Sequence, residues 1–298
     1  MRFALLLLLA APALAQPEWR TTPTGPAVSV DVLTALGDDL TGDVIEGLDD
    51  MAPGARFEMV STAVVVGGRV PLASGWTVVA EVPVSFSRMT ARGFGTAFSG
   101  NDSFSSDGLS LGNPYVGVER RVLPSLALGG GVRVPLARYD DESTDTPGWL
   151  GGLTADPERF EAYLPEIATV SVLARFEPTL GPARLRMRLA PTVHYDTAED
   201  FFGQDQFSRA GVVLGYSVQA ETDLRPFTLS AGVVGRPILS GERYELFETS
   251  AAAVLGAQAK VGGVRPGVGV RVPLGLDDVP APFRSDATVG FSLEVPVR

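Results

Sequence analysis

The sequence predicts an all-β chain that forms one antiparallel transmembrane β-barrel of about twelve strands, with short periplasmic turns and longer extracellular loops. Three observations support this fold class. Apolar and polar residues alternate with a period of two over many segments, as strands with one apolar and one polar face require. Short and long connectors alternate between these segments. The N-terminus has the composition of a secretory signal peptide.

Residues 1–15 are expected to be a signal peptide, and residues 16–298 to form the barrel. A basic residue, Arg2, precedes an apolar run, and the small residues Ala13 and Ala15 favour cleavage directly after them. The apolar run is too short for a membrane-spanning helix, which needs about 20 apolar residues. Because the chain contains no cysteine, it has neither a lipoprotein acceptor nor a disulfide framework.

The strands are predicted from the alternation itself. In the segment 126–136, Leu128, Val132 and Leu136 fall on one face, whereas Arg133 and Pro135 fall on the other. No stretch of the mature chain is long and apolar enough to be a helical span. The predicted strands are 27–36, 56–71, 75–88, 107–122, 125–138, 166–178, 183–196, 208–223, 227–240, 246–262, 264–275 and 284–298.

The connectors between these strands fall into two classes that alternate along the chain, as in outer-membrane barrels. An even number of strands then leaves both termini on the periplasmic side. The short turns are expected at 73–75, near Pro124, and at 179–182, 223–226 and 262–263. The longer connectors are 37–55, 89–106, 139–165, 197–207, 241–245 and 276–283.

Five strands that leave a short turn carry a proline eight to ten residues later. This spacing corresponds to a rise of about 20–25 Å, the height of the apolar band of a barrel. The prolines therefore either mark the outer rim of that band or are scattered over strand ends in a proline-rich chain. Both interpretations place them at strand ends or bulges. The residues are Pro83, Pro135, Pro191, Pro237 and Pro273.

Aromatic residues lie near both classes of connector. Trp76, Phe176 and Phe227 are beside short turns, and Tyr195 and Phe247 are near long connectors. Two interfacial girdles have this distribution, but so do aromatic residues beside the turns of a soluble sandwich.

The connector 139–165 is expected to contain a short helix. Asp156 can cap it, Pro157 suits its first position, and Pro165 ends it. The pattern leaves open whether this helix covers the mouth of the barrel or folds inward.

The charge pattern excludes some partners. The net charge of −11 is concentrated in the acidic stretches 38–50 and 139–146, which are typical of solvated loops, so nucleic acid is not an expected partner. The acidic run "DDESTD" lacks the ligand spacing of a calcium loop. The glycine-rich runs are not followed by a helix that could hold phosphate. No metal or cofactor site is indicated.

Charged residues on the polar faces of the strands are the candidates for lining the lumen. Arg184, Arg186 and Arg188 share one strand face, so their repulsion requires partners. Glu81, Glu119, Glu177, Glu221 and Glu294 have the matching parity. The arginines form either a salt-bridged lumen or a selectivity ring for anionic solutes. The predicted lumen-lining residues are Glu81, Arg133, Arg175, Arg184, Arg186, Arg188, Glu221 and Arg271.

The single histidine, His194, raises the alternative of a barrel hydrolase. Asp196 would share its strand face, but no serine motif accompanies the pair, and catalysis needs a base with a partnered nucleophile or activated water. A polar lumen residue is the simpler interpretation, and we expect the chain not to be an enzyme.

The segment "LSLGNPYVGVERRVLPSLALGGGVRVPLAR", residues 109–138, resembles a hairpin of bacterial outer-membrane barrels described as transporters or as similar to the meta-pathway phenol-degradation protein. The matching residues are Gly112, Asn113, Pro114, Gly117 and the pair Val134–Pro135. The resemblance implies uptake of small, often hydrophobic or aromatic solutes and brings no catalytic residues with it. The last strand, 288–295, is similar to the C-terminal signal that the outer-membrane assembly machinery reads, although the usual terminal aromatic residue is missing.

The function expected from the sequence is passage or binding of a small solute through the outer membrane of a Gram-negative-type bacterium. The expected partners are membrane lipid, the outer-membrane assembly machinery and the solute. Two alternatives remain open: a structural or adhesive barrel with a plugged lumen, and a soluble periplasmic β-sandwich in which a second sheet covers the apolar faces.

Overall fold

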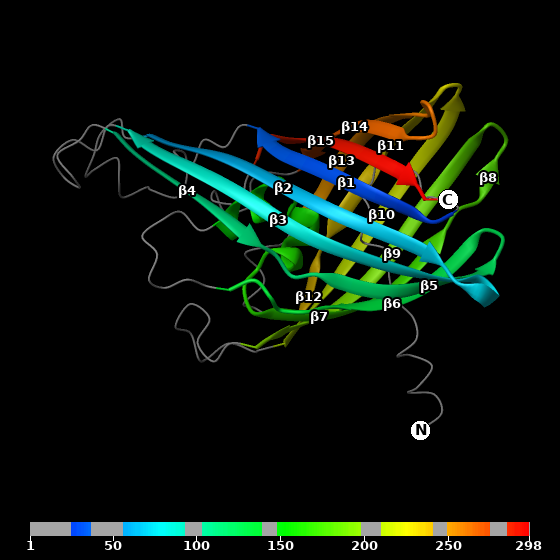
Figure 1. Cartoon of the computed structure of the whole chain (residues 1–298), viewed down its shortest axis with the longest axis horizontal. Helices are drawn as coiled ribbons and strands as arrows, with labels where there is room; N and C mark the ends of the chain where they lie inside the picture. The colour runs from blue at the N-terminus through cyan, green and yellow to red at the C-terminus, as the bar shows by residue number, and fades with distance from the viewer. Residues whose placement is uncertain are drawn as a thin grey trace.

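A computed structural model describes residues 25–36, 56–92, 103–138, 148–197, 210–240, 249–274 and 285–297 (Figure 1). The predicted signal peptide, both acidic stretches and the "DDESTD" run lie outside the described residues. Within the described part of the chain, no helix is both long and apolar enough to cross a membrane.

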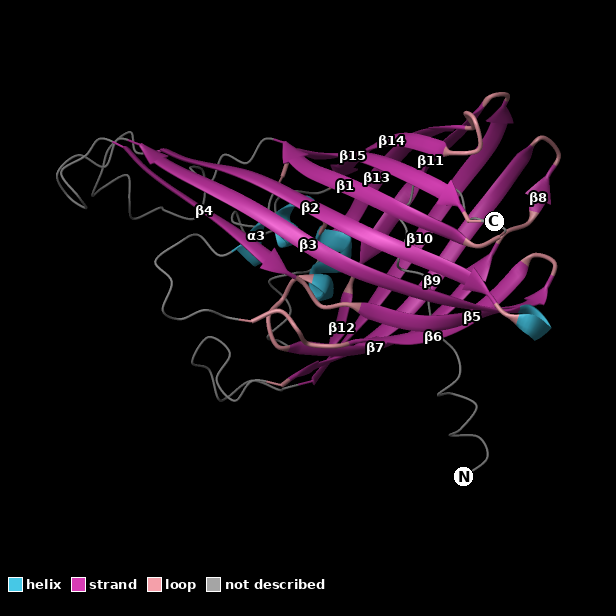
Figure 2. Cartoon of the chain, viewed as in Figure 1, coloured by secondary structure: helices cyan, strands magenta, loops and turns pink. Residues whose placement is uncertain are grey.

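The chain folds into a closed antiparallel β-barrel of twelve strands, which confirms the predicted fold class (Figure 2). The first and last strands pair from Ala27 with Pro296 to Leu36 with Ala287, and this pairing closes the barrel. Three of the twelve strands are interrupted and carry two labels each: β4 with β5, β7 with β8, and β11 with β12. The strands are β1 (Ala27–Leu36), β2 (Arg56–Pro71), β3 (Trp76–Arg92), β4 (Ser103–Leu111), β5 (Tyr115–Leu123), β6 (Leu126–Arg133), β7 (Ile167–Phe176), β8 (Thr179–Leu180), β9 (Ala183–Asp196), β10 (Ala210–Leu224), β11 (Phe227–Arg236), β12 (Ile238–Ser240), β13 (Thr249–Ala259), β14 (Arg265–Pro273) and β15 (Ala287–Pro296).

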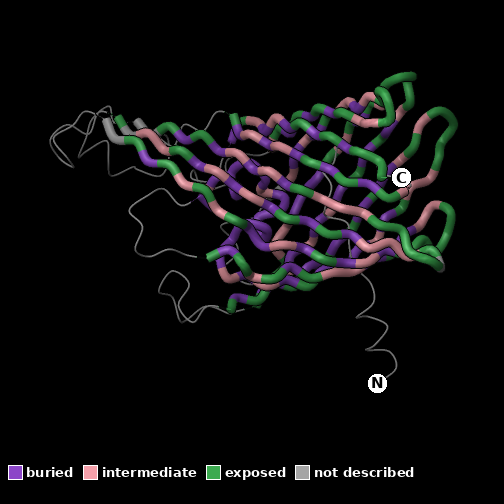
Figure 3. Tube along the Cα trace, in the orientation of Figure 1, coloured by how far each residue is buried: buried purple, intermediate pink, exposed green. Residues whose placement is uncertain are grey.

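Buried and exposed residues alternate along the strands, with the polarity of a soluble protein reversed (Figure 3). On β9 the buried residues include Arg186 and Thr192, whereas Leu189 and Val193 are exposed. In water this arrangement is unfavourable. The exposed valine and leucine side chains do not gain the free energy of transfer out of water, and the buried charges pay a desolvation cost. The same surface is stable when lipid covers the outside. The closed sheet has no second sheet to cover these faces, so the sandwich alternative fails for the described residues.

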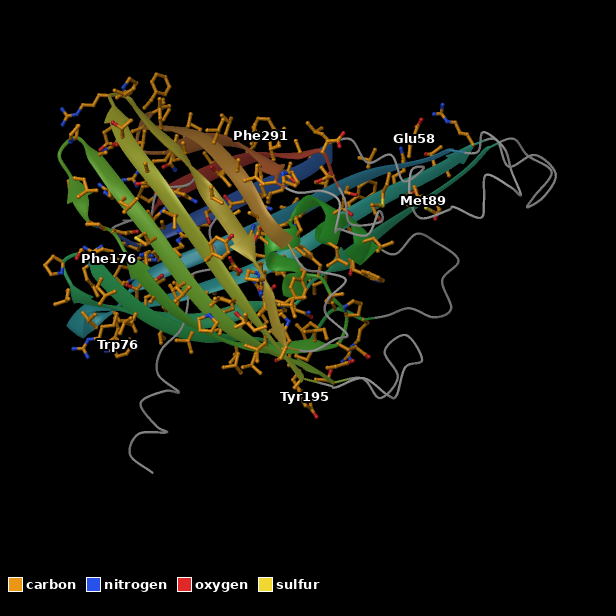
Figure 4. The ribbon with its side chains drawn as sticks, turned by 180° about the vertical axis from the view of Figure 1, so that it is seen from behind. Glu58, Trp76, Met89, Phe176, Tyr195 and Phe291 are labelled. Atoms are coloured by element: carbon orange, nitrogen blue, oxygen red, sulfur yellow. The ribbon has the colours of Figure 1, made fainter. Side chains whose placement is uncertain are left out.

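Aromatic residues mark the two ends of this apolar surface (Figure 4). Trp76 and Phe176 lie at the end that carries the short turns, Tyr195 lies toward the other end, and Phe291 lies between them. Phe176, Tyr195 and Phe291 are exposed, and the guanidinium of Arg120 lies 5.4 Å from the centre of the Trp76 ring. Trp76 and Phe176 are placed as an interfacial girdle at the short-turn end requires, whereas a girdle at the other end stays a prediction, since Phe247 lies outside the described residues.

The predicted strand bounds are matched at 27–36, 56–71 and 183–196, but one hairpin is longer than predicted. β3 continues to Arg92 and β4 begins at Ser103, with Arg92 and Ser103 paired. The connector predicted at 89–106 is correspondingly shorter. The extension could not be predicted from apolar–polar alternation, because β4 starts with "SFSSDG", which has no apolar face. These residues extend past the rest of the barrel (Figure 1), where water on both sides removes the need for alternation.

The prediction that all five prolines lie at strand ends or bulges is wrong for two of them. Pro135 follows β6, Pro237 separates β11 from β12, and Pro273 ends β14, but Pro83 and Pro191 lie inside strands and do not mark a common rim.

Both internal prolines face gaps in the pairing of their strands. The Pro83 carbonyl accepts a hydrogen bond from Gly112, at the break between β4 and β5. The missing N–H of Pro83 faces the same side, because both backbone groups of a strand residue point to one neighbour. Pro191 lies where the pairing of β7 with β9 is interrupted, between Ser171 and Ala174. Neither proline therefore removes a bond that the ladder uses.

Candidate lumen and inward loop

The lumen contains a folded segment, residues 148–164, which we call the inward loop. It consists of α3 (Gly148–Ala155), a 3₁₀ helix over Pro157–Ala162 and the two residues that follow. Nearly all of it is buried, and it packs against the walls formed by β1, β2, β3, β4, β7 and β11 (Figure 1). The loop therefore folds inward, which decides the question that its sequence left open.

The inward loop differs from the predicted helix. The segment after Asp156 is 3₁₀ and not α-helical, and Arg159 within it has non-helical backbone angles. The α-helix precedes Asp156 and has the sequence "GWLGGLTA", which gives no amphipathic signal because it is buried on all sides. Two of its glycines are required by close packing. A Cβ atom at Gly151 would overlap the Phe86 carbonyl, and one at Gly152 would overlap the Tyr163 ring.

Ion pairs connect the inward loop to the barrel wall. Glu161 lies 2.8 Å from Arg236 and 3.6 Å from Arg133. Arg236 also donates a hydrogen bond to the Glu158 carbonyl and lies over the Phe160 ring at 4.8 Å. Burial alone raises the pKa of Glu161, but the guanidinium groups of Arg236 and Arg133 outweigh it and hold that pKa below its usual value. Glu161 is therefore an anion that its cationic partners stabilise.

A second set of contacts joins Asp156, Arg159 and Glu81. Arg159 lies 2.5 Å from Asp156 and 3.5 Å from Glu81, and Glu81 lies 2.9 Å from Arg133. Asp156 is also 3.5 Å from Arg271. All of these side chains are nearly inaccessible to water. We call the connected residues the loop cluster: Glu81, Arg133, Asp156, Arg159, Glu161, Arg236 and Arg271.

Asn113, in the break between β4 and β5, binds the backbone of the inward loop. Its side-chain nitrogen donates to the carbonyls of Glu161 at 3.0 Å and Leu164 at 2.7 Å, and its side-chain oxygen accepts from the Ala137 N–H at 2.8 Å. Its backbone N–H donates to the Ala162 carbonyl at 2.7 Å. The "GNP" run that carried the resemblance therefore attaches the inward loop to the wall.

Nearer the short turns, the wall carries further ion pairs that do not involve the inward loop. Glu119 lies 2.6 Å from Arg69 and 3.1 Å from Arg175, which is also 3.2 Å from Glu177. On the opposite strands, Glu221 lies 3.0 Å from Arg186. We call these residues, with Arg184, Arg188, Arg265 and Glu294, the turn cluster.

The eight predicted lumen-lining residues divide between the two clusters. Seven are buried on the interior face of the wall, and Arg184 has 46% of its side chain exposed at the short-turn end. Glu81, Arg133 and Arg271 belong to the loop cluster, and Arg175, Arg184, Arg186, Arg188 and Glu221 to the turn cluster. Parity predicts a face for each residue, but it names no pairs. Sequence reasoning missed Arg236, which shares the buried parity of Val234 on β11, and both carboxylates of the inward loop.

His194 is fully buried, and its ring centre lies 5.0 Å from that of Phe160 in the inward loop. Asp196 on the same face is equally buried. The described residues contain no group of three or more histidine, aspartate or glutamate side chains that could hold a metal ion.

The closed barrel, its apolar exterior and its charged interior define a class of protein: this is an integral β-barrel of the Gram-negative outer membrane. Lipid is its immediate environment, because the exposed valine and leucine form the outward apolar band of a closed transmembrane barrel.

The comparisons with known proteins support this class. No protein-family model matches the sequence, and neither does any curated protein. Among solved structures, the COG4313 outer membrane channel from Pseudomonas putida F1 is similar over 95% of this chain and 99% of its own, with 14% identity and a TM-score of 0.55. A FadL homologue from Pseudomonas aeruginosa (12% identity, 91% and 90% covered) and a TodX monoaromatic hydrocarbon channel mutant (9%, 92% and 89%) both have TM-scores of 0.40. The first likeness shows a shared fold, and the other two are too distant to support an argument.

Proposed function

We propose that the chain is an outer-membrane channel for a small solute and that the inward loop closes its lumen in the conformation described here. The observation that carries this proposal is the way the loop is held. The loop packs against apolar wall residues such as Leu33, Ile167 and Val213. It is also fixed by buried carboxylate–guanidinium pairs and by Asn113, which are directional contacts that a small displacement breaks together. Burying these charges costs free energy that ion pairs recover only in part, so a permanent plug would be favoured by the apolar contacts alone.

The proposed solute class is hydrophobic or aromatic. Its support is the resemblance of residues 109–138 to barrels that take up such compounds. A solute of this kind would pass Trp149, Phe160 and Tyr163, the aromatic side chains that the inward loop holds in the lumen.

The experiment measures uptake of a labelled monoaromatic compound at low concentration by porin-poor Gram-negative cells that express the chain. We expect uptake several times that of the same cells with an empty vector. Equal uptake, with the chain confirmed in the outer membrane by a heat-dependent gel shift, would favour the structural or adhesive barrel.

We also propose that the chain has no enzymatic role. Phe160 covers His194, so a substrate cannot reach the imidazole while the inward loop is in place. The variant His194→Gln, which keeps a polar side chain, is expected to leave uptake within about twofold of the parent, since it removes no ion pair of the loop cluster. Hydrolysis of phospholipid or peptide by the purified parent, lost in this variant, would contradict the proposal.

For biogenesis, we propose that the assembly machinery recognises β15. Its support is the sequence pattern of 288–295, together with the position of β15 as the strand that pairs with β1 to close the barrel.

A further inference from the structure

A charged pocket opens at the short-turn end of the barrel. Figure 1 shows that β1 begins and β15 ends at this end. The pocket has a volume of about 820 Å³ and lies between the β10–β11 turn and the β13–β14 turn. The two turns are neighbours because Phe227 pairs with Leu224 on one side and with Ala259 on the other. Outer-membrane architecture places short turns in the periplasm.

Cations outnumber carboxylates in the lining of this pocket. Arg184, Arg225, Lys260 and Arg265 face a single acidic residue, Asp223. The Asp223 carboxylate already accepts a hydrogen bond of 2.6 Å from Thr228. This excess of positive side chains is unusual for a chain whose net charge is −11 and whose one lysine is Lys260.

Two of the four cations have partners, and two do not. Arg184 lies 3.7 Å from Glu221, and Arg265 lies 3.2 Å from Glu294. Arg225 and Lys260 form no ion pair with any residue that the structure describes. Unpaired cations in a concave surface produce a local positive potential that attracts anions, and both side chains bind carboxylate and phosphate well.

The rest of the lining is apolar. Pro226, Phe227 and Ala259 lie beside the cations, so the pocket offers an apolar surface next to a positive one. A fully hydrated inorganic anion would leave this surface unused. A small organic anion, with an acidic group on an apolar body, would use both.

We propose that this pocket is a binding site for a small organic anion, whose carboxylate or phosphate group lies between Arg225 and Lys260. The apolar body of the ligand then rests on Pro226 and Phe227. The site does not depend on passage through the lumen, because it opens directly at the short-turn end and would be present in a permanently closed barrel. The same acidic chemistry is offered by a soluble solute and by the headgroup of an anionic phospholipid.

The test is fluorine NMR of 4-fluorobenzoate with the full chain in detergent micelles and in nanodiscs of zwitterionic lipid. We expect saturable line broadening that weakens as salt is added, because exposed charges are screened. The double variant Arg225→Gln/Lys260→Gln should lower the affinity at least about fivefold, the loss of two exposed ion pairs of roughly half a kcal/mol each. The control is Arg121→Gln, which removes an exposed arginine near another short turn, outside the pocket, and should leave the affinity unchanged.

Two further arms identify the source of the acidic group. Competition by inorganic phosphate, with no effect of phosphatidylglycerol in the nanodisc, supports a soluble ligand. Displacement of the probe by phosphatidylglycerol supports the same site with a lipid headgroup as its occupant. Absence of saturable binding, or equal binding to the parent and the double variant, overturns the proposal. Because the three substituted side chains, Arg225, Lys260 and Arg121, are exposed and lie outside the lumen clusters, a heat-dependent gel shift suffices to show that the barrels are folded.

Discussion

Replacing residues 148–164 by a short glycine–serine linker is expected to convert a silent barrel into a conducting one. The inward loop lies in the lumen against β1, β2, β3, β4, β7 and β11, and by the function proposed above it is the segment that closes the lumen. In planar bilayers the parent should rarely open, whereas every inserted copy of the deletion variant should carry a steady current. This is the largest effect that we expect.

A gentler variant separates the loss of the loop from general disruption of the barrel. Asp156→Asn with Glu161→Gln keeps the loop but removes the carboxylates that Arg236, Arg133 and Arg271 contact. Loss of about 1.4 kcal/mol from the closed state raises the open fraction about tenfold, and breaking buried ion pairs costs at least this much. Silence of both variants, after correct insertion, would mean that the turn cluster closes the lumen and that the inward loop is not its gate.

Replacing Glu81 by alanine is expected to destabilise the folded barrel by about 3–5 kcal/mol. Glu81 is the carboxylate partner of two buried arginines, Arg133 at 2.9 Å and Arg159 at 3.5 Å. Without it, Arg133 keeps Glu161 at 3.6 Å and Arg159 keeps Asp156 at 2.5 Å, but the same guanidinium groups share one negative charge fewer in a region closed to water. This costs much more than the loss of a surface pair. Urea unfolding in lipid vesicles, followed by tryptophan fluorescence, measures the change, and the buried Trp149 of the inward loop is a suitable reporter.

The matched control is an exposed pair on the same hairpin. Glu58 lies 3.4 Å from Arg92, and the two side chains are 54% and 61% exposed (Figure 4). Glu58→Ala should therefore cost at most about 1 kcal/mol. Glu81→Gln, which retains a hydrogen-bonding oxygen, should fall between the two. If Glu58→Ala and Glu81→Ala lower the free energy of unfolding equally, the buried ion pairs of the loop cluster contribute no more to stability than an exposed pair does.

The barrel could be predicted from the sequence because the apolar–polar alternation that indicates each strand involves only neighbouring residues. Alternation over 183–196 gave the bounds of β9 and the buried parity of Arg186, Arg188 and His194 together. A shift of one residue would have turned all three outward. The hairpin of β3 and β4 was shortened in the prediction because polar residues outside the apolar band carry no such signal.

The inward loop and the ion pairs could not be predicted in the same way, because they depend on residues far apart in the chain. Glu81 and Arg133 lie on strands that do not pair with each other, since β5 separates β3 from β6. Asn113 finds its partners about fifty positions later, at Glu161 and Leu164. Parity restricts a side chain to the lumen but does not say at what height or opposite which partner it lies. Only the closed barrel supplies that information.

The most direct test of the whole account asks which face of a strand the bilayer covers. The chain has no cysteine, so a spin label can be attached at Leu293→Cys or Ser292→Cys, neighbours on β15 that are 43% and 5% exposed. In lipid vesicles, we expect frequent collisions of molecular oxygen with the label at 293 and rare collisions with the label at 292, since oxygen concentrates in the hydrocarbon. Equal or reversed collision rates would contradict it, because valine and leucine would then not face lipid and the charged residues would not face a lumen.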